Sequence, residues 1–177
     1  MTAIEALAKQ TIDANLWVEK LIANIPEEQW TDTPEGIQSN ISWQIGHLII
    51  SIYYHTILVI KGHQPEIFQK VPIKEYADLF TVASIPTIAA DKSAPSELKS
   101  HYAIITEASI KTIKSLSEEE LNHKLVPGEV EHPVAKTKFE ALDWNIKHTM
   151  WHCGQIATLK RVLGVSHIFE LKKVSRK

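Results

Sequence analysis

Residues 137–164 read TKFEALDWNIKHTMWHCGQIATLKRVLG and decide much of the fold. Thr137 and Glu140 form a capping box, in which the hydroxyl accepts a backbone N–H and the carboxylate accepts the cap's own N–H. A glycine follows the last apolar residues, which is where helices commonly end. The stretch therefore predicts one long helix that carries His148 and His152 one turn apart on the same face.

The inward face of this helix can be estimated by turning about 100° per residue from His148. Residues within about 60° of His148 on this count should face the interior of the protein. They are Ala141, Trp144, Asn145, Trp151, His152, Gln155, Leu159 and Val162. Cys153 falls about 140° away, so we expect an inert thiol that does not share a ligand with the two histidines.

Three other segments space their apolar residues at three and four, which is typical of amphipathic helices. These segments are residues 3–25, opened by a Thr2–Glu5 capping box, residues 41–61, capped by Ser39 or Asn40, and residues 96–115. A Ser117–Glu120 capping box predicts one further short turn, and residues 123–136 are expected to form a loop or a hairpin. No segment has the period-2 pattern of a strand.

The connection from residue 63 to residue 95 holds four of the eight prolines and one short amphipathic piece, residues 74–82. A link of this length allows a crossover that leaves its two helices parallel, whereas short links favour antiparallel neighbours. We therefore predict an all-α protein, a four-helix bundle with up-down-down-up topology. The long crossover joins the second and third helices, and residues 1–177 form a single domain.

Composition excludes several classes of protein. The formal charge of −2, from 19 Lys and Arg against 21 Asp and Glu, offers no basic surface for nucleic acid. The N-terminus does not resemble a signal peptide. The longest apolar stretch, residues 48–60, is shorter than the roughly 20 residues that span a bilayer. With one cysteine there is no disulfide framework, so we expect a soluble, cytoplasmic protein without a membrane partner.

A third histidine, His47, lies in a Trp-x3-His pattern that parallels Trp144-x3-His148. If the two halves are a duplicated helical hairpin, His47 and His148 face each other across the bundle, and Ser51 lies opposite His152. Three imidazoles with one vacant position are typical of a catalytic metal site, whereas structural zinc usually has four protein ligands.

Three polar residues near this site are candidates for supporting roles. Tyr54 and Gln155 could orient a ligand of the metal by hydrogen bonding, and these two are our predicted catalytic residues. Asn145 could hydrogen-bond an imidazole N–H.

Chance offers a competing interpretation, because an i,i+4 histidine pair arises easily among nine histidines. We expect the other six to lie on the surface, in loops or in ordinary hydrogen bonds: His55, His63, His101, His123, His132 and His167. Of these, His55 is the nearest in helical phase to the candidate ligands, since it falls about 80° from His47 around the helix. The tryptophans Trp43, Trp144 and Trp151 are expected to pack in the core.

The chain resembles the DinB-like superfamily in two places. One is Gly46-His47-Leu48, and the more specific one is His148-x3-His152-x-Gly154-Gln155-Ile156 followed by Arg161. The resemblance extends from the first helix to Gly164 and implies the same up-down-down-up bundle. It also implies that His47, His148 and His152 bind a divalent metal ion, with zinc or nickel foremost. Residues 63–95 and 123–136 carry no motif of the family, and we expect them to determine substrate selectivity.

Members of that superfamily with an assigned reaction conjugate low-molecular-weight thiols to electrophiles, and many are homodimers. The resemblance thus implies a metal-dependent thiol transferase that acts on a small-molecule substrate and forms a homodimer. Two alternatives remain at this point. The same ion could activate water in a hydrolase, or the bundle could be a non-catalytic, stress-associated binding protein.

Overall fold

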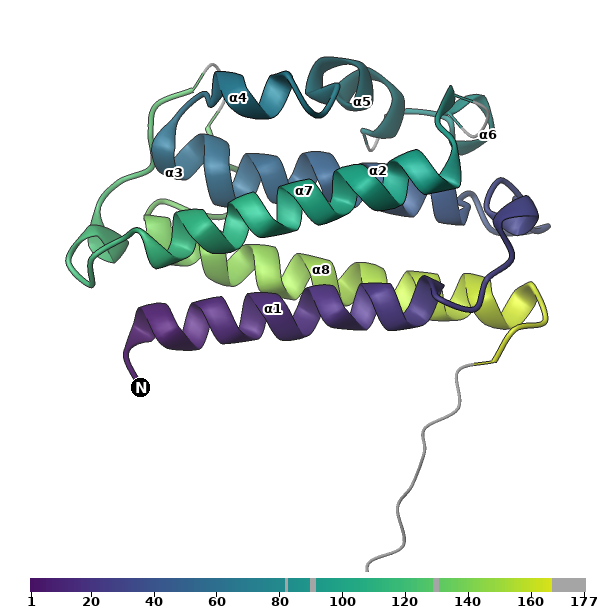
Figure 1. Cartoon of the computed structure of the whole chain (residues 1–177), viewed down its shortest axis with the longest axis horizontal. Helices are drawn as coiled ribbons and strands as arrows, with labels where there is room; N and C mark the ends of the chain where they lie inside the picture. The colour runs from purple at the N-terminus through teal and green to yellow at the C-terminus, as the bar shows by residue number, and fades with distance from the viewer. Residues whose placement is uncertain (82, 90–91, 129–130, 167–177) are drawn as a thin grey trace, which may run out of the picture.

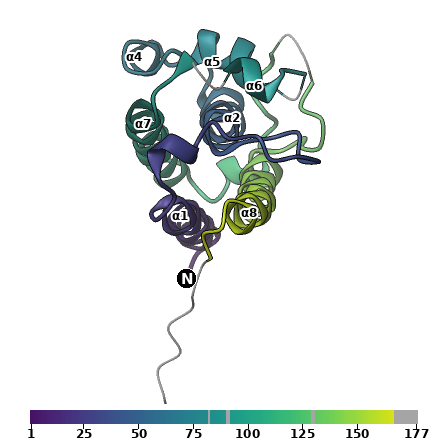
Figure 2. The same ribbon diagram turned by 90° about the vertical axis from the view of Figure 1, so that its right-hand side faces the viewer.

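The computed structural model describes residues 1–81, 83–89, 92–128 and 131–166. Its four long helices are α1 Ala3–Ile22, α2 Ile41–Tyr53, α7 Pro95–Lys114 and α8 Lys138–Val162. α1 packs on α7 and α8, and α2 packs on the same two helices, so the four enclose the interior, whose buried hydrophobic residues form two clusters (Figures 1 and 2). No strand occurs in the described ranges, which confirms the all-α class. The up-down-down-up order stays a prediction.

The helix ends follow the local signals in the sequence. All three predicted capping boxes form, at Thr2 with Glu5, at Ser117 with Glu120 and at Thr137 with Glu140. Asn40 caps α2 by accepting the Trp43 N–H at 2.8 Å. Gly164 follows α8 with a φ of 79°, which a glycine adopts without strain. α1 ends at Ile22 rather than at residue 25, because Pro26 restricts the residue before it to an extended conformation.

The second long helix changes its hydrogen-bonding pattern near its end. After α2 the chain forms a π-helical turn, η2 Tyr54–Leu58, and then the short α3 Val59–Lys61, which ends before Gly62 at a φ of 83°. The expected helix over residues 41–61 is therefore continuous but irregular. A π turn accommodates an additional residue and changes the direction of the side chains within it, and such turns are frequent at functional sites.

The crossover is an ordered layer over α2 rather than a simple connection. It contains α4 Pro65–Phe68, α5 Ile73–Phe80 and α6 Pro86–Ala89, which Figure 1 shows above α2. α5 packs directly on α2 and buries Ile73, Tyr76 and Phe80. The amphipathic piece predicted here thus exists, although residue 82 lies outside the described residues. A Cβ atom on Gly46 would overlap the Phe80 ring, so this close packing requires a glycine.

Shorter elements complete the fold. A 3-10 turn, η1 Glu27–Gln29, follows α1, and a second, η4 Glu120–Asn122, begins at the predicted Ser117–Glu120 box. In the loop expected over residues 123–136, Lys124 forms an isolated antiparallel bridge with Thr137. The stretch Ile41–Lys61 is long and apolar enough to cross a membrane, but 72% of it is buried inside the bundle, as in the core helix of a soluble domain.

Candidate metal centre

Three histidines from α2 and α8 converge in the interior of the bundle. One ring nitrogen from each of His47, His148 and His152 lies within 4.8 Å of the other two. The Nε2 atoms of His148 and His152 are 3.2 Å apart. Two nitrogens bound to one tetrahedral zinc ion at about 2.05 Å would be about 3.3 Å apart. The donor set and its spacing therefore fit a divalent ion such as zinc or nickel.

The ring of His47 is oriented by the crossover layer. Its Nδ1 lies 2.7 Å from the carbonyl oxygen of Phe80, at the end of α5. Because a carbonyl only accepts, Nδ1 carries the proton, and the lone pair of Nε2 is directed to the other two histidines. In this structure the Ser51 hydroxyl, at 3.2 Å, donates to that Nε2. Trp43 stacks on the same ring with centroids 4.9 Å apart.

The ring of His152 is oriented by an amide network. The Gln44 side chain donates to Ser39 Oγ and to Gln155 Oε1, both at 2.8 Å. Its own oxygen is thus an acceptor, and it lies 2.6 Å from Nδ1 of His152. His152 is therefore protonated on Nδ1, which leaves the Nε2 lone pair for a metal ion.

The ring of His148 has no such support. Its Nδ1 is buried without a hydrogen-bond partner, and so is Oδ1 of Asn145, in the part of the chain that the structure describes. The predicted hydrogen bond from an imidazole to Asn145 is therefore wrong. Both atoms lie on α8, only three residues apart, and the helix does not turn them toward each other. His148 is instead contacted by neighbouring rings, those of Trp144 and Trp151 among them.

All three candidate ligands are neutral near pH 7. Burial, together with smaller effects of the nearby rings of His47 and His148, lowers the pKa of His152 to about 3. Burial, together with His47, lowers the pKa of His148 to about 4. Burial also lowers the pKa of His47, and the hydrogen bond to Phe80 partly opposes this shift. Neutral imidazole is the form that binds a metal ion, so the site is ready for one without losing protons.

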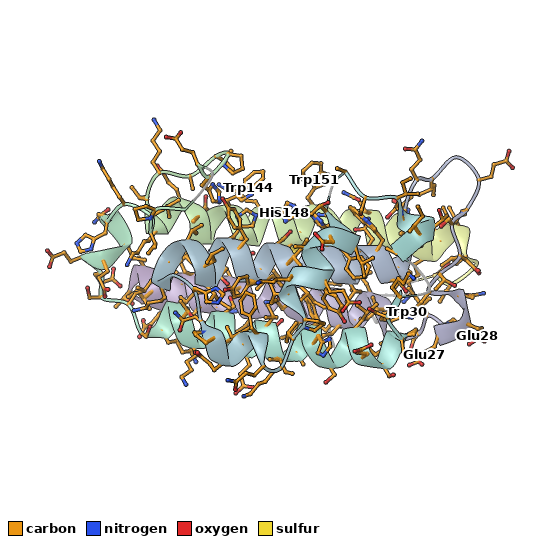
Figure 3. The ribbon with its side chains drawn as sticks, turned by 90° about the horizontal axis from the view of Figure 1, so that it is seen from above. Glu27, Glu28, Trp30, Trp144, His148 and Trp151 are labelled. Atoms are coloured by element: carbon orange, nitrogen blue, oxygen red, sulfur yellow. The ribbon has the colours of Figure 1, made fainter. Side chains whose placement is uncertain are left out.

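The tryptophans surround the histidines, and of the three only Trp43 packs against the hydrophobic core described, as predicted. Figure 3 shows Trp144, His148 and Trp151 along one side of α8. Trp151 is 62% exposed and Val162 is 55% exposed, so the predicted inward stripe is wrong at these two positions. Trp43 and Trp144 are half-buried. The inward face estimated from an ideal helix is wider than the observed one, because the neighbouring helices cover only part of that face of α8.

The two predicted catalytic residues lie at different distances from the histidines. Gln155 contacts Gln44 and so reaches His152 through one intervening amide. Tyr54 lies two turns beyond His47, where its ring stacks on His132 with centroids 5.5 Å apart. Unlike these two, Ser51 contacts a candidate ligand directly, through its bond to His47. The sequence placed Ser51 at the site but suggested no role for it.

A second histidine pair borders the first group. Nδ1 of His55 lies 2.7 Å from Nε2 of His132, and the His55 and His148 ring centroids are 5.6 Å apart. His55 is buried, and burial lowers its pKa to about 3, with smaller effects from His132, His148 and His47. Both residues were expected in ordinary hydrogen bonds, which they make, but their position beside the site could not be predicted. His167 lies outside the described residues.

The cysteine is remote from this centre, as expected. Cys153 is buried in the core, and its thiol lies 3.9 Å from the carbonyl oxygen of Ala14 on α1. Burial raises the pKa of this thiol to about 12, so it stays protonated and unreactive.

Fold and site define a helical-bundle protein with three histidines that could hold a metal ion. The chain belongs to the DinB superfamily, whose family model matches residues 18–156. It is also similar to a solved structure described as the crystal structure of the conserved protein of locus from Enterococcus faecalis. The TM-score is 0.68 at 16% identity, over 92% of this chain and 98% of that one, which shows a shared fold. No curated protein matches the chain.

Proposed function

We propose that this protein is a metal-dependent transferase that activates a low-molecular-weight thiol for attack on an electrophile. The observation that supports this most is the convergence of three neutral imidazoles at one point. A divalent ion, zinc or nickel, with three neutral ligands keeps its double charge and lowers the pKa of a thiol bound at the open position. The histidines therefore supply a site that favours an anionic sulfur.

The surrounding residues orient this site. Gln44 and the Phe80 carbonyl hold two of the three rings with Nε2 directed inward. The Ser51 hydroxyl donates to His47 in this structure. When the lone pair of His47 binds a metal ion, that hydroxyl is free to donate to the sulfur of the thiol. In this proposal Gln155 acts through Gln44, and Tyr54 contacts the substrate farther along α2.

The hydrogen-bond partners of the three histidines favour thiol transfer over hydrolysis, because none of them in the described residues is a carboxylate. Within the described residues, the hydrogen bonds of the three histidines go to a carbonyl, an amide, a hydroxyl or another ring. Metal-dependent peptide hydrolases commonly use a glutamate as the general base for water. A thiol needs less help, because its pKa of about 8.5 is close to neutrality before any metal binds.

The test combines metal binding with thiol consumption. Titration calorimetry with zinc and nickel on protein purified without a histidine tag should show one site, and His148→Ala should lose it. With the metal bound, an electrophile should consume thiol in a one-to-one ratio. Absence of metal binding to the parent would overturn the proposal. Release of acid from esters without loss of thiol would identify a hydrolase, and a lower melting temperature after chelation without any turnover would identify a binding protein.

The setting of this reaction is also proposed. The substrates are small molecules, and the single reduced cysteine agrees with a cytoplasmic location. A homodimer is expected from the superfamily, and sedimentation equilibrium of the purified protein would measure it.

A further inference from the structure

A cavity of about 470 Å³ lies between the second half of α2 and the crossover layer. Its walls are mostly apolar and include Ile50, Leu58, Phe68, Ile73 and Ala77. Lys74 and His63 also line it, but both are exposed, and no carboxylate is among the lining residues. This volume suits a small organic molecule, and apolar walls of this kind disfavour a charged one.

The cavity reaches the metal centre through two residues. Ser51 and His55 both line it, one and two helical turns beyond His47. The Ser51 hydroxyl lies 3.2 Å from Nε2 of His47, and the His55 ring contacts the His148 ring at 5.6 Å. Ser51 and His55 therefore lie between the cavity and the three histidines, and a molecule in the cavity is separated from His47 or His148 by one side chain.

His55 presents one hydrogen-bond donor with a defined position. His132 accepts the backbone N–H groups of Val134 and Ala135 on its Nδ1, so its proton is on Nε2. That proton is donated to Nδ1 of His55, which places the proton of the neutral His55 ring on its own Nε2. Among the described residues this Nε2 forms no hydrogen bond, and it is not one of the polar atoms that are fully buried without a partner. Because His55 lines the cavity, this N–H is the donor that we assign to a ligand there.

We propose that this cavity binds the electrophile, an uncharged and largely apolar molecule with one hydrogen-bond acceptor that His55 holds. This inference rests on the proposed thiol transfer. With 1-chloro-2,4-dinitrobenzene as the electrophile, the thiol loses its proton to solvent on binding. The sulfur then forms a bond to the ring carbon, and chloride leaves with the electron pair of the broken bond. A nitro oxygen is the acceptor for His55.

Binding can be measured apart from catalysis with N-phenyl-1-naphthylamine, an uncharged fluorescent molecule. We expect saturable binding to the zinc-loaded protein, weakened at least tenfold by Ala77→Trp, which fills the cavity. Ala103→Trp is the matched control, because Ala103 is exposed on α7, away from the cavity, and should leave binding unchanged. The anion 8-anilinonaphthalene-1-sulfonate, which adds a sulfonate to the same rings, should bind at least tenfold more weakly. The proposal would be overturned if Ala77→Trp and Ala103→Trp bound the naphthylamine equally well. It would also be overturned if the parent protein bound the naphthylamine and the sulfonate equally well.

The role of His55 is tested in the reaction with 1-chloro-2,4-dinitrobenzene after subtraction of the uncatalysed rate. His55→Phe should raise the KM for this electrophile about fivefold, while the KM for the thiol and the affinity for zinc stay the same. His55→Gln, which restores a donor, should recover most of the loss. Equal KM values for the electrophile in all three proteins would exclude His55 as the anchor. Failure of the parent to bind zinc or consume thiol would instead overturn the proposed function, whatever the naphthylamine shows.

Discussion

Two pairs of helices bury polar side chains in this bundle, and they do so in different ways. Between α2 and α8, Gln44 uses both amide hydrogens and its oxygen to hold His152, Gln155 and Ser39 in place. On α1 and α7, the only hydrogen bond among the buried polar side chains described joins Tyr102 to Asn15, at 2.6 Å. The hydroxyls of Thr11 and Ser109 are buried there without a partner.

The polar side chains of α2 and α8 orient the candidate metal ligands, whereas those of α1 and α7 are buried without such a role. The network around Gln44 determines the tautomer and the direction of the His152 ring, which is what a metal ligand needs, although Nδ1 of His148 on the same helix is buried without a partner. A buried hydroxyl without a partner determines no direction and costs free energy. We therefore expect α2 and α8 to respond strongly to substitution and pH, and α1 and α7 to respond weakly.

The largest effect should come from removing a ligand. Tight zinc binding by structural sites with four ligands is worth about 10–16 kcal/mol, so one histidine contributes roughly 3–4 kcal/mol. His152→Ala should thus weaken zinc binding by about 100- to 1000-fold in a competition titration with a chelator. Cys153→Ser, one residue along the helix, should leave the affinity unchanged. The reverse result would mean that α8 is rotated relative to this structure.

The next effect is the pH dependence of stability without metal. In the folded state the pKa of His55 and of His152 is lowered to about 3, whereas in the unfolded chain it is near 6.5. Below pH 6.5 the unfolded chain therefore binds protons that the folded chain does not, and stability is lost as the pH falls toward the folded pKa values. From pH 8 to pH 5 these two residues together should lower the free energy of unfolding by about 2–4 kcal/mol.

Urea unfolding at the two pH values measures this loss. Asn15→Leu, which alters the polar residues of α1, should keep the same pH dependence because no group that titrates in this range is changed. A stability that stays constant between pH 8 and pH 5 would show that the histidines are solvated and not buried.

A smaller effect is expected from the amide that supports His152. Gln44→Met keeps the length of the side chain but removes its three hydrogen bonds. Loss of such a partner typically lowers metal affinity 10–100-fold. Gln155→Met leaves the bond between Gln44 and His152 intact and should cost less, as measured by the same chelator competition. If Gln155→Met costs as much, Gln155 contacts the ion or its ligand directly.

The smallest effect should follow from Ser109→Ala on α7. The hydroxyl of Ser109 is buried without a partner, so its removal relieves an unfavourable burial and loses little packing. The free energy of unfolding should change by less than about 1 kcal/mol, in either direction, and zinc affinity should not change. A loss of more than about 2 kcal/mol in urea unfolding would show that Ser109 has a hydrogen-bond partner in solution.

Local sequence patterns predicted the helices better than the residues that support the site. The capping boxes at Thr2 and Thr137 and the glycine after α8 place helix ends correctly, because each depends on atoms within a few residues. The i,i+4 spacing brings His148 and His152 together for the same reason. The exposure of Trp151 was not predicted, since it depends on how much of α8 the neighbouring helices cover.

The contacts that orient the histidines join distant parts of the chain. His47 is held by the carbonyl of Phe80, 33 residues away, and His152 by Gln44, 108 residues away. The sequence did not indicate that Phe80 packs against Gly46, although the missing Cβ of this glycine is what lets the Phe80 ring approach. Likewise, the π turn at residues 54–58 and the pairing of His55 with His132 have no local signal that we could read.

By itself, then, the sequence determined an all-helical protein and the pairing of His148 with His152, since apolar periodicity and helical spacing are properties of single helices. It indicated His47 through the repeated Trp-x3-His pattern and the resemblance to the superfamily. The tertiary structure decided which nitrogen of His47 and of His152 faces the centre, which side chains support them, and where a cavity adjoins the site. Those features follow from packing between α2, α5 and α8, and a hydrogen bond across that packing exists only once the helices are in contact.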